Sequence, residues 1–293
     1  MALNDMVSVI IPAKNEAKSL RNLLTKIQEL PINQDWEIIV VNDGSTDETS
    51  SVCKSACVKE IKHPYSKGNG AAIKSGARIA KGSILICMDG DGQHKPEDIP
   101  RLLETLGKDY DMVVGSRDNK SQASFGRLAA NKLYNRLASW MVGREIEDLT
   151  SGFRAVRADK FREFLYMLPN GFSYPTTSTM AFFRAGYSVC YEPIVALKRE
   201  GKSHIDLKKD GIRFLLIIFK VGTLYSPLKL FTPISASFFM TGLVYYGYTL
   251  SFFGRFTNMS GLLFTTAVII FLMGLVSEQI TMLMYSKNDP NKE

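Results

Sequence analysis

The chain has 293 residues, of which 45% are hydrophobic and 22% charged, so a substantial core is expected and wholesale disorder is disfavoured. The formal net charge is +7, but Lys and Arg are not gathered into a polybasic tail, which disfavours a nucleic-acid-binding protein. A membrane surface or a phosphate-rich substrate accounts for the same excess. The four cysteines fit a reduced compartment, and no signal peptide is evident, so we expect the N-terminal part in the cytoplasm.

Apolar runs of strand length alternate with amphipathic segments over the first part of the chain. This alternation predicts a parallel α/β sheet flanked by helices. The expected helices follow Glu16 and span Ala71–Ala80 and Pro96–Leu106. The expected strands are Val7–Ile11, Trp36–Val41, Val58–Ile61, Ile84–Met88 and Met112–Gly115.

The fourth of these strands ends in the acidic turn Asp89-Gly-Asp-Gly-Gln93. In open α/β sheets, ligands bind at the carboxyl ends of the strands. Two carboxylates and one amide supply hard oxygen ligands that suit Mg²⁺ or Mn²⁺ and leave positions for substrate phosphates. A solvated acidic turn is the alternative interpretation. An EF-hand loop is excluded, since His94 stands where that loop needs Gly.

Two other strand ends carry polar loops. Pro12-Ala-Lys-Asn-Glu16 closes the first strand, and Asn42-Asp-Gly-Ser-Thr-Asp47 closes the second. Helix N-capping is an alternative role for Glu16 and Asp43. Neither a P-loop nor a dinucleotide fingerprint is present, because Ile73 occupies the place of the third glycine after Gly68 and Gly70.

Beyond Arg117 the pattern is less regular. The sequence predicts a helix over Gly126–Val142 that is basic on one side, and a strand over Val189–Val195. Three loops are expected: Asp148–Arg154, which runs into a strand, Asn170–Thr179, which is rich in Gly, Pro, Ser and Thr and is expected to be mobile, and the basic Lys198–His204.

Two long runs near the C-terminus contain no charged residue. Leu230–Phe253 and Phe256–Ser277 are each long enough to cross a bilayer core, and only Gly254 and Arg255 separate them. We therefore expect a transmembrane helical hairpin, with a pair of buried core helices as the alternative. Positive residues flank both ends of the hairpin, which predicts that both ends are cytoplasmic. The amphipathic stretch Gly211–Tyr225 is expected to form an interfacial helix on the inner leaflet.

Together these stretches resemble family-2 glycosyltransferases with the GT-A fold, and within them the branch that transfers a sugar to a polyprenyl phosphate. That branch includes dolichyl-phosphate mannose synthases and polyprenyl-phosphate glucosyltransferases. The resemblance covers the chain from about Val7 to Ser203, and the hairpin is a second point of agreement. It implies a Rossmann-like nucleotide-sugar-binding domain at 1–205, an amphipathic juxtamembrane segment at 206–227 and two transmembrane helices within 228–286.

The resemblance also implies a role for each motif. The acidic turn is similar to the family's DxD region, so Asp91 and Gln93 would hold the metal and Asp89 would assist or contact the ribose. Together with Arg117, these residues form the expected catalytic set. The donor nucleotide would lie against Pro12, Ala13, Asn15, Glu16 and Asp43. The acceptor phosphate would lie against Arg117, Arg127, Asn131, Arg199 and Ser203, although His204 stands where Lys is expected.

The implied activity is transfer of a hexose from a UDP- or GDP-linked donor to dolichyl or undecaprenyl phosphate at the inner leaflet, with inversion and with Mg²⁺ or Mn²⁺. A phosphate monoester is itself an anionic nucleophile, so it needs cations to position it rather than a strong base. A polysaccharide synthase is one alternative, but neither Trp36 nor Trp140 lies in its Gln-x-x-Arg-Trp stretch. A non-catalytic membrane scaffold is the other alternative. The sequence is also compatible with a homo-oligomer.

Overall fold

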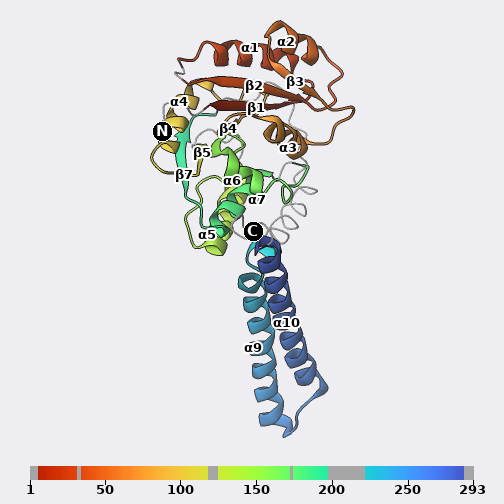
Figure 1. Cartoon of the computed structure of the whole chain (residues 1–293). Coiled ribbons are helices and arrows are strands. Elements are labelled where there is room, and N and C mark those ends of the chain that lie inside the picture. The colour runs from red at the N-terminus through yellow and green to blue at the C-terminus, as the bar shows by residue number, and fades with distance from the viewer. Residues whose placement is uncertain (1–5, 32–33, 118–124, 172–173, 197–221, 287–293) are drawn as a thin grey trace. The chain divides into compact units, whose positions relative to one another are not determined.

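The structure is a computed structural model that describes residues 6–31, 34–117, 125–171, 174–196 and 222–286, except for the side chains of residues 125–131 and 285–286. The chain divides into two compact units, Met1–His204 and Ile205–Glu293. Figure 1 shows the first unit as a sheet with helices and the second as a helical hairpin. The predicted interfacial helix over 211–225 lies mostly outside the described residues.

A seven-stranded sheet forms the centre of the first unit, in the order β3-β2-β1-β4-β6-β5-β7 (Figure 1). This mixed α/β arrangement confirms the predicted fold class. The strands are β1 (Val7–Ala13), β2 (Trp36–Asn42), β3 (Lys59–Lys62), β4 (Ile84–Cys87), β5 (Met112–Arg117), β6 (Arg154–Arg157) and β7 (Val189–Ile194).

The expectation of an all-parallel sheet is wrong at β6, which runs antiparallel to both β4 and β5. The chain leaves β5 at its carboxyl end, and the backbone N–H of Gly115 already bonds the carbonyl of Phe153, just before β6 begins. The chain therefore enters β6 from the edge at which β5 ends, and β6 must run back along the sheet.

Helices cover both faces of the sheet. Apolar residues of α1, α2 and α4 share a buried cluster with Val7, Val9 and Ile11 of β1. On the other face α3 approaches β1 so closely that a Cβ at Gly76 would lie 2.4 Å from Ile10 Cγ2. The helices of this unit are α1 (Ala17–Gln28), α2 (Thr49–Ser55), α3 (Asn69–Ile79), the 3₁₀ turn η1 (Pro96–Asp98), α4 (Ile99–Leu106), α5 (Phe125–Val142), α6 (Ala158–Glu163) and α7 (Tyr174–Arg184).

The prediction of a mobile loop over Asn170–Thr179 is wrong from Tyr174 onwards, where α7 begins and its first nine residues are buried. Composition misleads here because the polar groups have tertiary partners. The fully buried Arg154 donates to Pro175 O at 3.1 Å and to Ser178 Oγ at 2.7 Å. Ser178 Oγ in turn donates to the carbonyl of Tyr174 at 2.9 Å, one turn back.

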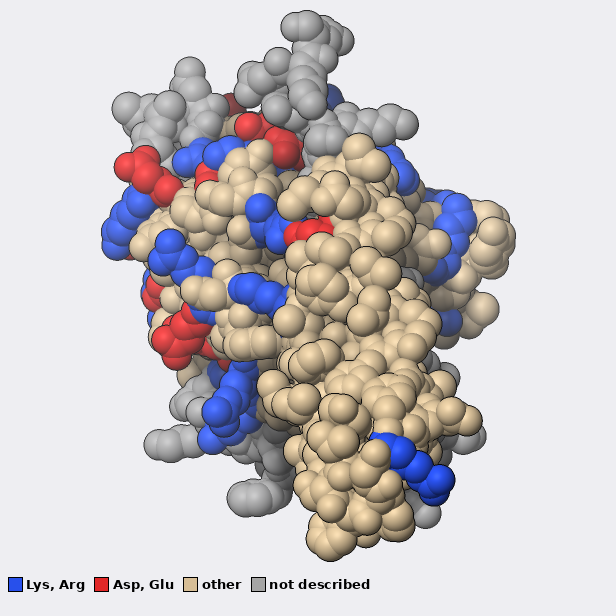
Figure 2. Space-filling view, turned by 90° about the horizontal axis from the view of Figure 1, so that it is seen from below, with Lys and Arg blue, Asp and Glu red and all other residues tan. Residues whose placement is uncertain are grey.

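The second unit is the predicted hairpin of α9 (Pro227–Phe253) and α10 (Asn258–Ser286), joined by a turn in which Gly254 adopts a left-handed conformation. Both helices are long and apolar enough to cross a membrane. Only 6% and 17% of their most apolar windows are buried, which argues against soluble core helices. Figure 2 shows that uncharged side chains dominate the hairpin surface.

Candidate active site

The sheet brings the three polar loops predicted from the sequence to one edge. Because β1 pairs in parallel with both β2 and β4, the carboxyl ends of all three strands lie side by side. The backbone N–H of Asp43 donates to Ala13 O at 2.9 Å, and that of Gly90 donates to Pro12 O at 3.3 Å. Pro12 and Ala13 therefore lie between the second loop and the acidic turn.

Asn15 joins the first loop to the second. Its backbone is left-handed, with φ of 55°, and its N–H donates to Ser45 Oγ at 3.0 Å. Its side-chain Oδ1 accepts the N–H of Thr46 at 2.8 Å. Asparagine is among the residues that tolerate this conformation best. The side-chain oxygen of Asn15 is thus used to fix the loop.

Glu16 does not cap α1 with its side chain. That role belongs to Asp47, whose Oδ2 accepts the N–H of Ala17 at 3.0 Å across the two loops. Glu16 instead accepts a hydrogen bond from Ser19 Oγ at 3.0 Å, and the same hydroxyl lies 2.9 Å from the carbonyl of Gly90. Glu16 therefore lies beside the acidic turn.

Asp43 is a buried hub rather than a helix cap. Its carboxylate accepts four hydrogen bonds, from His63 Nδ1 at 2.6 Å, Ser66 Oγ at 2.8 Å, Lys67 N at 2.8 Å and Gly68 N at 2.9 Å. Burial alone would raise the pKa of Asp43, but these bonds outweigh it and lower the pKa to about 2. A carboxylate offers about four lone-pair positions. A nucleotide base could therefore donate to Asp43 only by replacing one of these donors.

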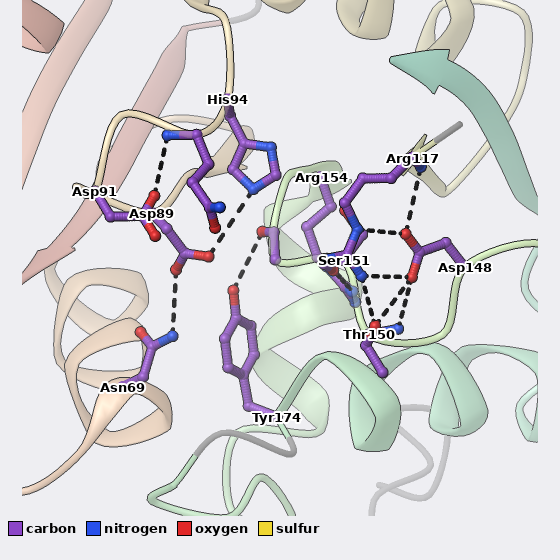
Figure 3. A network of polar contacts seen from close by, with 12 residues as sticks. Asn69, Asp89, Asp91, His94, Arg117, Asp148, Thr150, Ser151, Arg154 and Tyr174 are labelled. Atoms are coloured by element: carbon purple, nitrogen blue, oxygen red, sulfur yellow. Dashed lines mark hydrogen bonds and ion pairs between the residues drawn. The ribbon is translucent and has the colours of Figure 1, made fainter. Parts of the chain in front are cut away.

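The acidic turn projects from β4 into a polar network (Figure 3). Asp91 Oδ1 accepts the backbone N–H of Gln93 at 3.1 Å, which tightens the turn. Asp89 Oδ1 accepts from Asn69 Nδ2 at 3.2 Å, and Asp89 Oδ2 lies 3.9 Å from His94 Nε2. The ring of His94 stacks on Phe153, and burial lowers its pKa to about 4, so the imidazole is neutral at neutral pH.

On the other side of this network, Asp148 orients Arg117 at the end of β5. Arg117 Nε donates to Asp148 Oδ2 at 2.7 Å and Nη2 to Oδ1 at 3.0 Å, a bidentate pair, while Nη2 also donates to Thr150 Oγ1 at 2.6 Å. Burial alone would lower the pKa of Arg117, but Asp148 raises it. Arg117 is thus held as a fixed cation.

Gly152 brings the Asp148–Arg154 loop against the acidic turn. A Cβ at this position would lie 2.8 Å from Asp89 Oδ2 and 3.3 Å from Tyr174 Oη. Tyr174 Oη itself donates to the carbonyl of Gly152 at 3.2 Å. The loop that holds Arg117 therefore also touches Asp89, so the cation and the acidic turn belong to one connected site (Figure 3).

The structure describes only part of the predicted acceptor set. Arg127 and Asn131 lie on the backbone of α5, but their side chains are outside the described residues, as are Arg199 and Ser203 entirely. The sequence interpretation did not assign roles to Asn69, His63 and Tyr174. Asn69 directly follows Gly68, in the glycine-containing stretch at the start of α3, but its spacing to Asp89 carried no signal.

The residues of the acidic turn fit a divalent cation. Among the described residues, no group of three or more His, Cys, Asp or Glu forms a metal cluster. Asp89, Asp91 and Gln93 instead offer oxygen atoms from one short turn beside Arg117. Mg²⁺ is often bound by one or two carboxylates, with substrate phosphates and water completing the shell. The turn suits that kind of shared site.

Comparisons with known proteins agree with this geometry. Residues 8–165 match glycosyl transferase family 2, and residues 226–283 match the GtrB C-terminal hairpin. This chain belongs to glycosyl transferase family 2.

Curated relatives are similar over about half of this chain. An undecaprenyl-phosphate 4-deoxy-4-formamido-L-arabinose transferase of Proteus mirabilis is 36% identical over 52% of this chain and 48% of its own length. A dolichol-phosphate mannosyltransferase of Pyrococcus furiosus is 35% identical over 52% of this chain and 46% of its own. The chain thus spans about half the length of these two relatives.

A solved structure shares the fold. Glucosyl-3-phosphoglycerate synthase from Mycobacterium tuberculosis, in complex with Mn²⁺, UDP-glucose and phosphoglyceric acid, superimposes with a TM-score of 0.60 over 74% of this chain and 79% of its own. The sequence identity is 18%, so the likeness concerns the fold.

Asp43→Asn should destabilise the protein in a pH-dependent way. The pKa of Asp43 falls from 3.8 to about 2 on folding, so its contribution is complete above 3.8 and is lost as the pH falls towards 2. At pH 7 the loss of satisfied hydrogen bonds should cost about 1–3 kcal/mol. Melting temperatures in detergent, measured between pH 7 and pH 3, test this. Asp35→Asn, at an exposed position, is the control. An equal deficit at every pH would contradict the expectation.

Gly152→Ala should displace Asp89, because the new methyl group would overlap its carboxylate. Changes to the surroundings of a metal ligand cost about 10- to 100-fold in metal affinity. We expect a loss of that size in the binding of Mn²⁺ and UDP, measured by calorimetry. Gly171→Ala is the matched control, since a Cβ there meets nothing within 4 Å. Unchanged binding by Gly152→Ala would show that Asp89 is not needed for it.

Proposed function

We propose that this protein transfers a hexose from a nucleotide-sugar to a polyprenyl phosphate at the inner leaflet of the membrane and so makes a lipid-linked sugar donor. The observation that carries the proposal is the joining of the acidic turn and the oriented Arg117 in one site, in a chain that also contains two apolar helices. The acidic turn can hold a metal ion that neutralises an anionic leaving group, and the cation Arg117 can hold an anionic acceptor. The names of the Proteus and Pyrococcus relatives support the same class of acceptor.

In this proposal the donor lies at the ends of β1, β2 and β4. The residues that would line it are Pro12, Ala13, Asn15, Glu16 and Asp43, with Asp89 near the ribose. Asn15 and Asp43 would act largely by fixing the loops, because their oxygen atoms are already used by protein donors. The acidic turn would place the diphosphate beside Asp91, and Arg117 would hold the acceptor phosphate.

Asp89, Asp91 and Gln93 would hold the Mg²⁺ or Mn²⁺, which supplies neutralisation of the charge on the departing diphosphate. An oxygen of the acceptor phosphate would bond to the anomeric carbon from the opposite side, and the bond from that carbon to the diphosphate oxygen would break with its electron pair. This in-line displacement inverts the configuration at the anomeric carbon. No side-chain base is required, because the phosphate is already anionic.

Transfer of label tests the proposal directly. Membranes containing the protein are incubated with polyprenyl phosphate and a panel of UDP- and GDP-sugars labelled in the sugar, and the lipid extract is counted. We expect one donor to label the lipid, and Asp91→Ala or chelation to abolish labelling, the latter reversibly. Asp35→Ala serves as the control. Binding of a nucleotide-sugar without transfer to any lipid would favour a non-catalytic role, and full activity under chelation would rule out the metal.

Arg117→Lys tests the acceptor assignment. An arginine–phosphate contact contributes about 1.5–3 kcal/mol, or roughly ten- to a hundredfold in rate. Lysine keeps the positive charge beside Asp148 but cannot form the paired hydrogen bonds of a guanidinium. The KM for the acceptor should therefore rise while the affinity for the donor stays unchanged. Asp148→Asn, which frees the guanidinium, should raise the acceptor KM less. If donor affinity collapses and acceptor KM holds, Arg117 serves the donor diphosphate.

The orientation of the hairpin is part of the proposal: both ends cytoplasmic and the turn outside. Lys229 near the start of α9 and Lys287 after α10 motivate it. A cysteine at Asn258 should react with an impermeant maleimide in intact cells, and one at Ser286 only after the cells are opened. Cys57→Ser removes the exposed native thiol. Labelling of position 286 from outside would contradict the two-span arrangement.

A further inference from the structure

The carboxylate of Asp43 is fully used by four donors, but these donors are not equally fixed. Oδ1 accepts from His63 Nδ1 at 2.6 Å and from the backbone N–H of Lys67 at 2.8 Å. Oδ2 accepts from Ser66 Oγ at 2.8 Å and from the backbone N–H of Gly68 at 2.9 Å. Because the pKa of Asp43 is lowered to about 2, the carboxylate is ionised at neutral pH and can only accept hydrogen bonds. A ligand must therefore bring a donor and displace one of the four.

Three of these donors are held in place by other contacts. His63 is 4% exposed, and its second ring nitrogen lies 2.9 Å from Ser75 Oγ of α3. The N–H groups of Lys67 and Gly68 belong to the main chain. Gly68 adopts a φ of 101° and lies so close to the loop before α7 that a Cβ there would be 2.4 Å from Asn170 O. Displacing any of the three would require movement of a buried ring or of the packed main chain.

Ser66 differs, because only its side chain reaches the carboxylate. Its main chain packs on Gly44, where a Cβ would lie 2.7 Å from Ser66 N. The residue is exposed, as are Tyr65 and Lys67 on either side of it. Rotation about one side-chain bond would therefore free one position on Oδ2 and leave the main chain in place. A ligand in that position would share Oδ2 with the N–H of Gly68.

We propose that Ser66 acts as a gate at the base-binding position, and that the single place it opens selects uracil over guanine. Uracil presents one N–H, the imide at N3, between two carbonyl groups. Guanine presents two neighbouring donors on the matching edge, and pairing both requires a free position on each carboxylate oxygen. Oδ1 of Asp43 has none, since His63 and Lys67 occupy it. One guanine donor would stay unpaired, and a site rejects a ligand that leaves a polar group unpaired.

The proposal rests on the proposed function, which places the donor nucleotide at Asp43, and ligands alone test it. The full-length protein in detergent is titrated calorimetrically, with Mn²⁺ present, with UDP, GDP and 3-methyl-UDP, in which a methyl group replaces the N3 proton. We expect UDP to bind roughly 10- to 100-fold more tightly than either of the others, because each of them loses one satisfied hydrogen bond in a buried position. Pyrophosphate, which has no base, measures the share of binding that the diphosphate supplies.

Ser66→Ala removes the group that competes with the base for Oδ2. UDP should then bind about two- to tenfold more tightly, because the hydrogen bond of Ser66 no longer has to be broken. Binding of 3-methyl-UDP should not change. Ser51→Ala, which removes an exposed hydroxyl on α2, is the matched control and should alter neither affinity. If Ser66 instead contacted the nucleotide directly, the variant would bind UDP more weakly.

Three results would overturn the proposal: equal affinity for UDP and 3-methyl-UDP, affinity for GDP that equals or exceeds that for UDP, or weaker binding of UDP by Ser66→Ala. Calorimetry needs no turnover, so the outcome is separate from that of the labelling experiment. Selection of uracil by a protein that labels no lipid would reject the transferase proposal and keep the base site. Labelling of lipid from a GDP-sugar alone would do the reverse, and failure of every nucleotide to bind would reject both.

Discussion

The pairing of β1 with β2 on one side and β4 on the other is the constraint on which the site depends. Parallel pairing puts the three carboxyl ends at one edge, and the register aligns Ala13 with Asn42 and Ile10 with Cys87. The close approach of α3 at Gly76 keeps this part of the sheet covered on its second face. Residues far apart in the chain thereby meet at one edge of the sheet.

The second half of the site uses the reversal of β6. Because β6 enters the sheet between β4 and β5, the loop before it lies beside the ends of both strands. One end of that loop pairs Asp148 with Arg117, and the other packs Gly152 on Asp89. An ion pair of this kind, in which Asp148 is buried and Arg117 is partly exposed, is weak evidence for stability. Its value here is orientation, since it fixes one guanidinium in the same connected site as the acidic turn.

The sequence predicts this edge well because buried parallel strands have a strong local signature. The apolar runs around Val9, Ile39 and Ile86 end at the polar loops, and the hairpin follows from length and absence of charge alone. The direction of β6 and the helix at Tyr174 could not be predicted in this way. The direction of β6 depends on its pairing with β4 and β5, and the helix at Tyr174 depends on the buried Arg154, whose partners have no sequence pattern. A locally polar stretch is predicted to be a loop unless the distant residues that hydrogen-bond to it are known.

Asp43 shows why a sequence motif alone does not define the role of a residue. A carboxylate at the end of β2 suggests an acceptor for a base N–H, yet the protein already supplies four donors to it. Two of these are backbone N–H groups of Lys67 and Gly68, immediately before Asn69, which bonds Asp89. A nucleotide that took one of those places would therefore shift the start of α3 and, through Asn69, the acidic turn. In the proposed donor site, nucleotide binding would thus be coupled to the geometry of Asp89 through this one short segment.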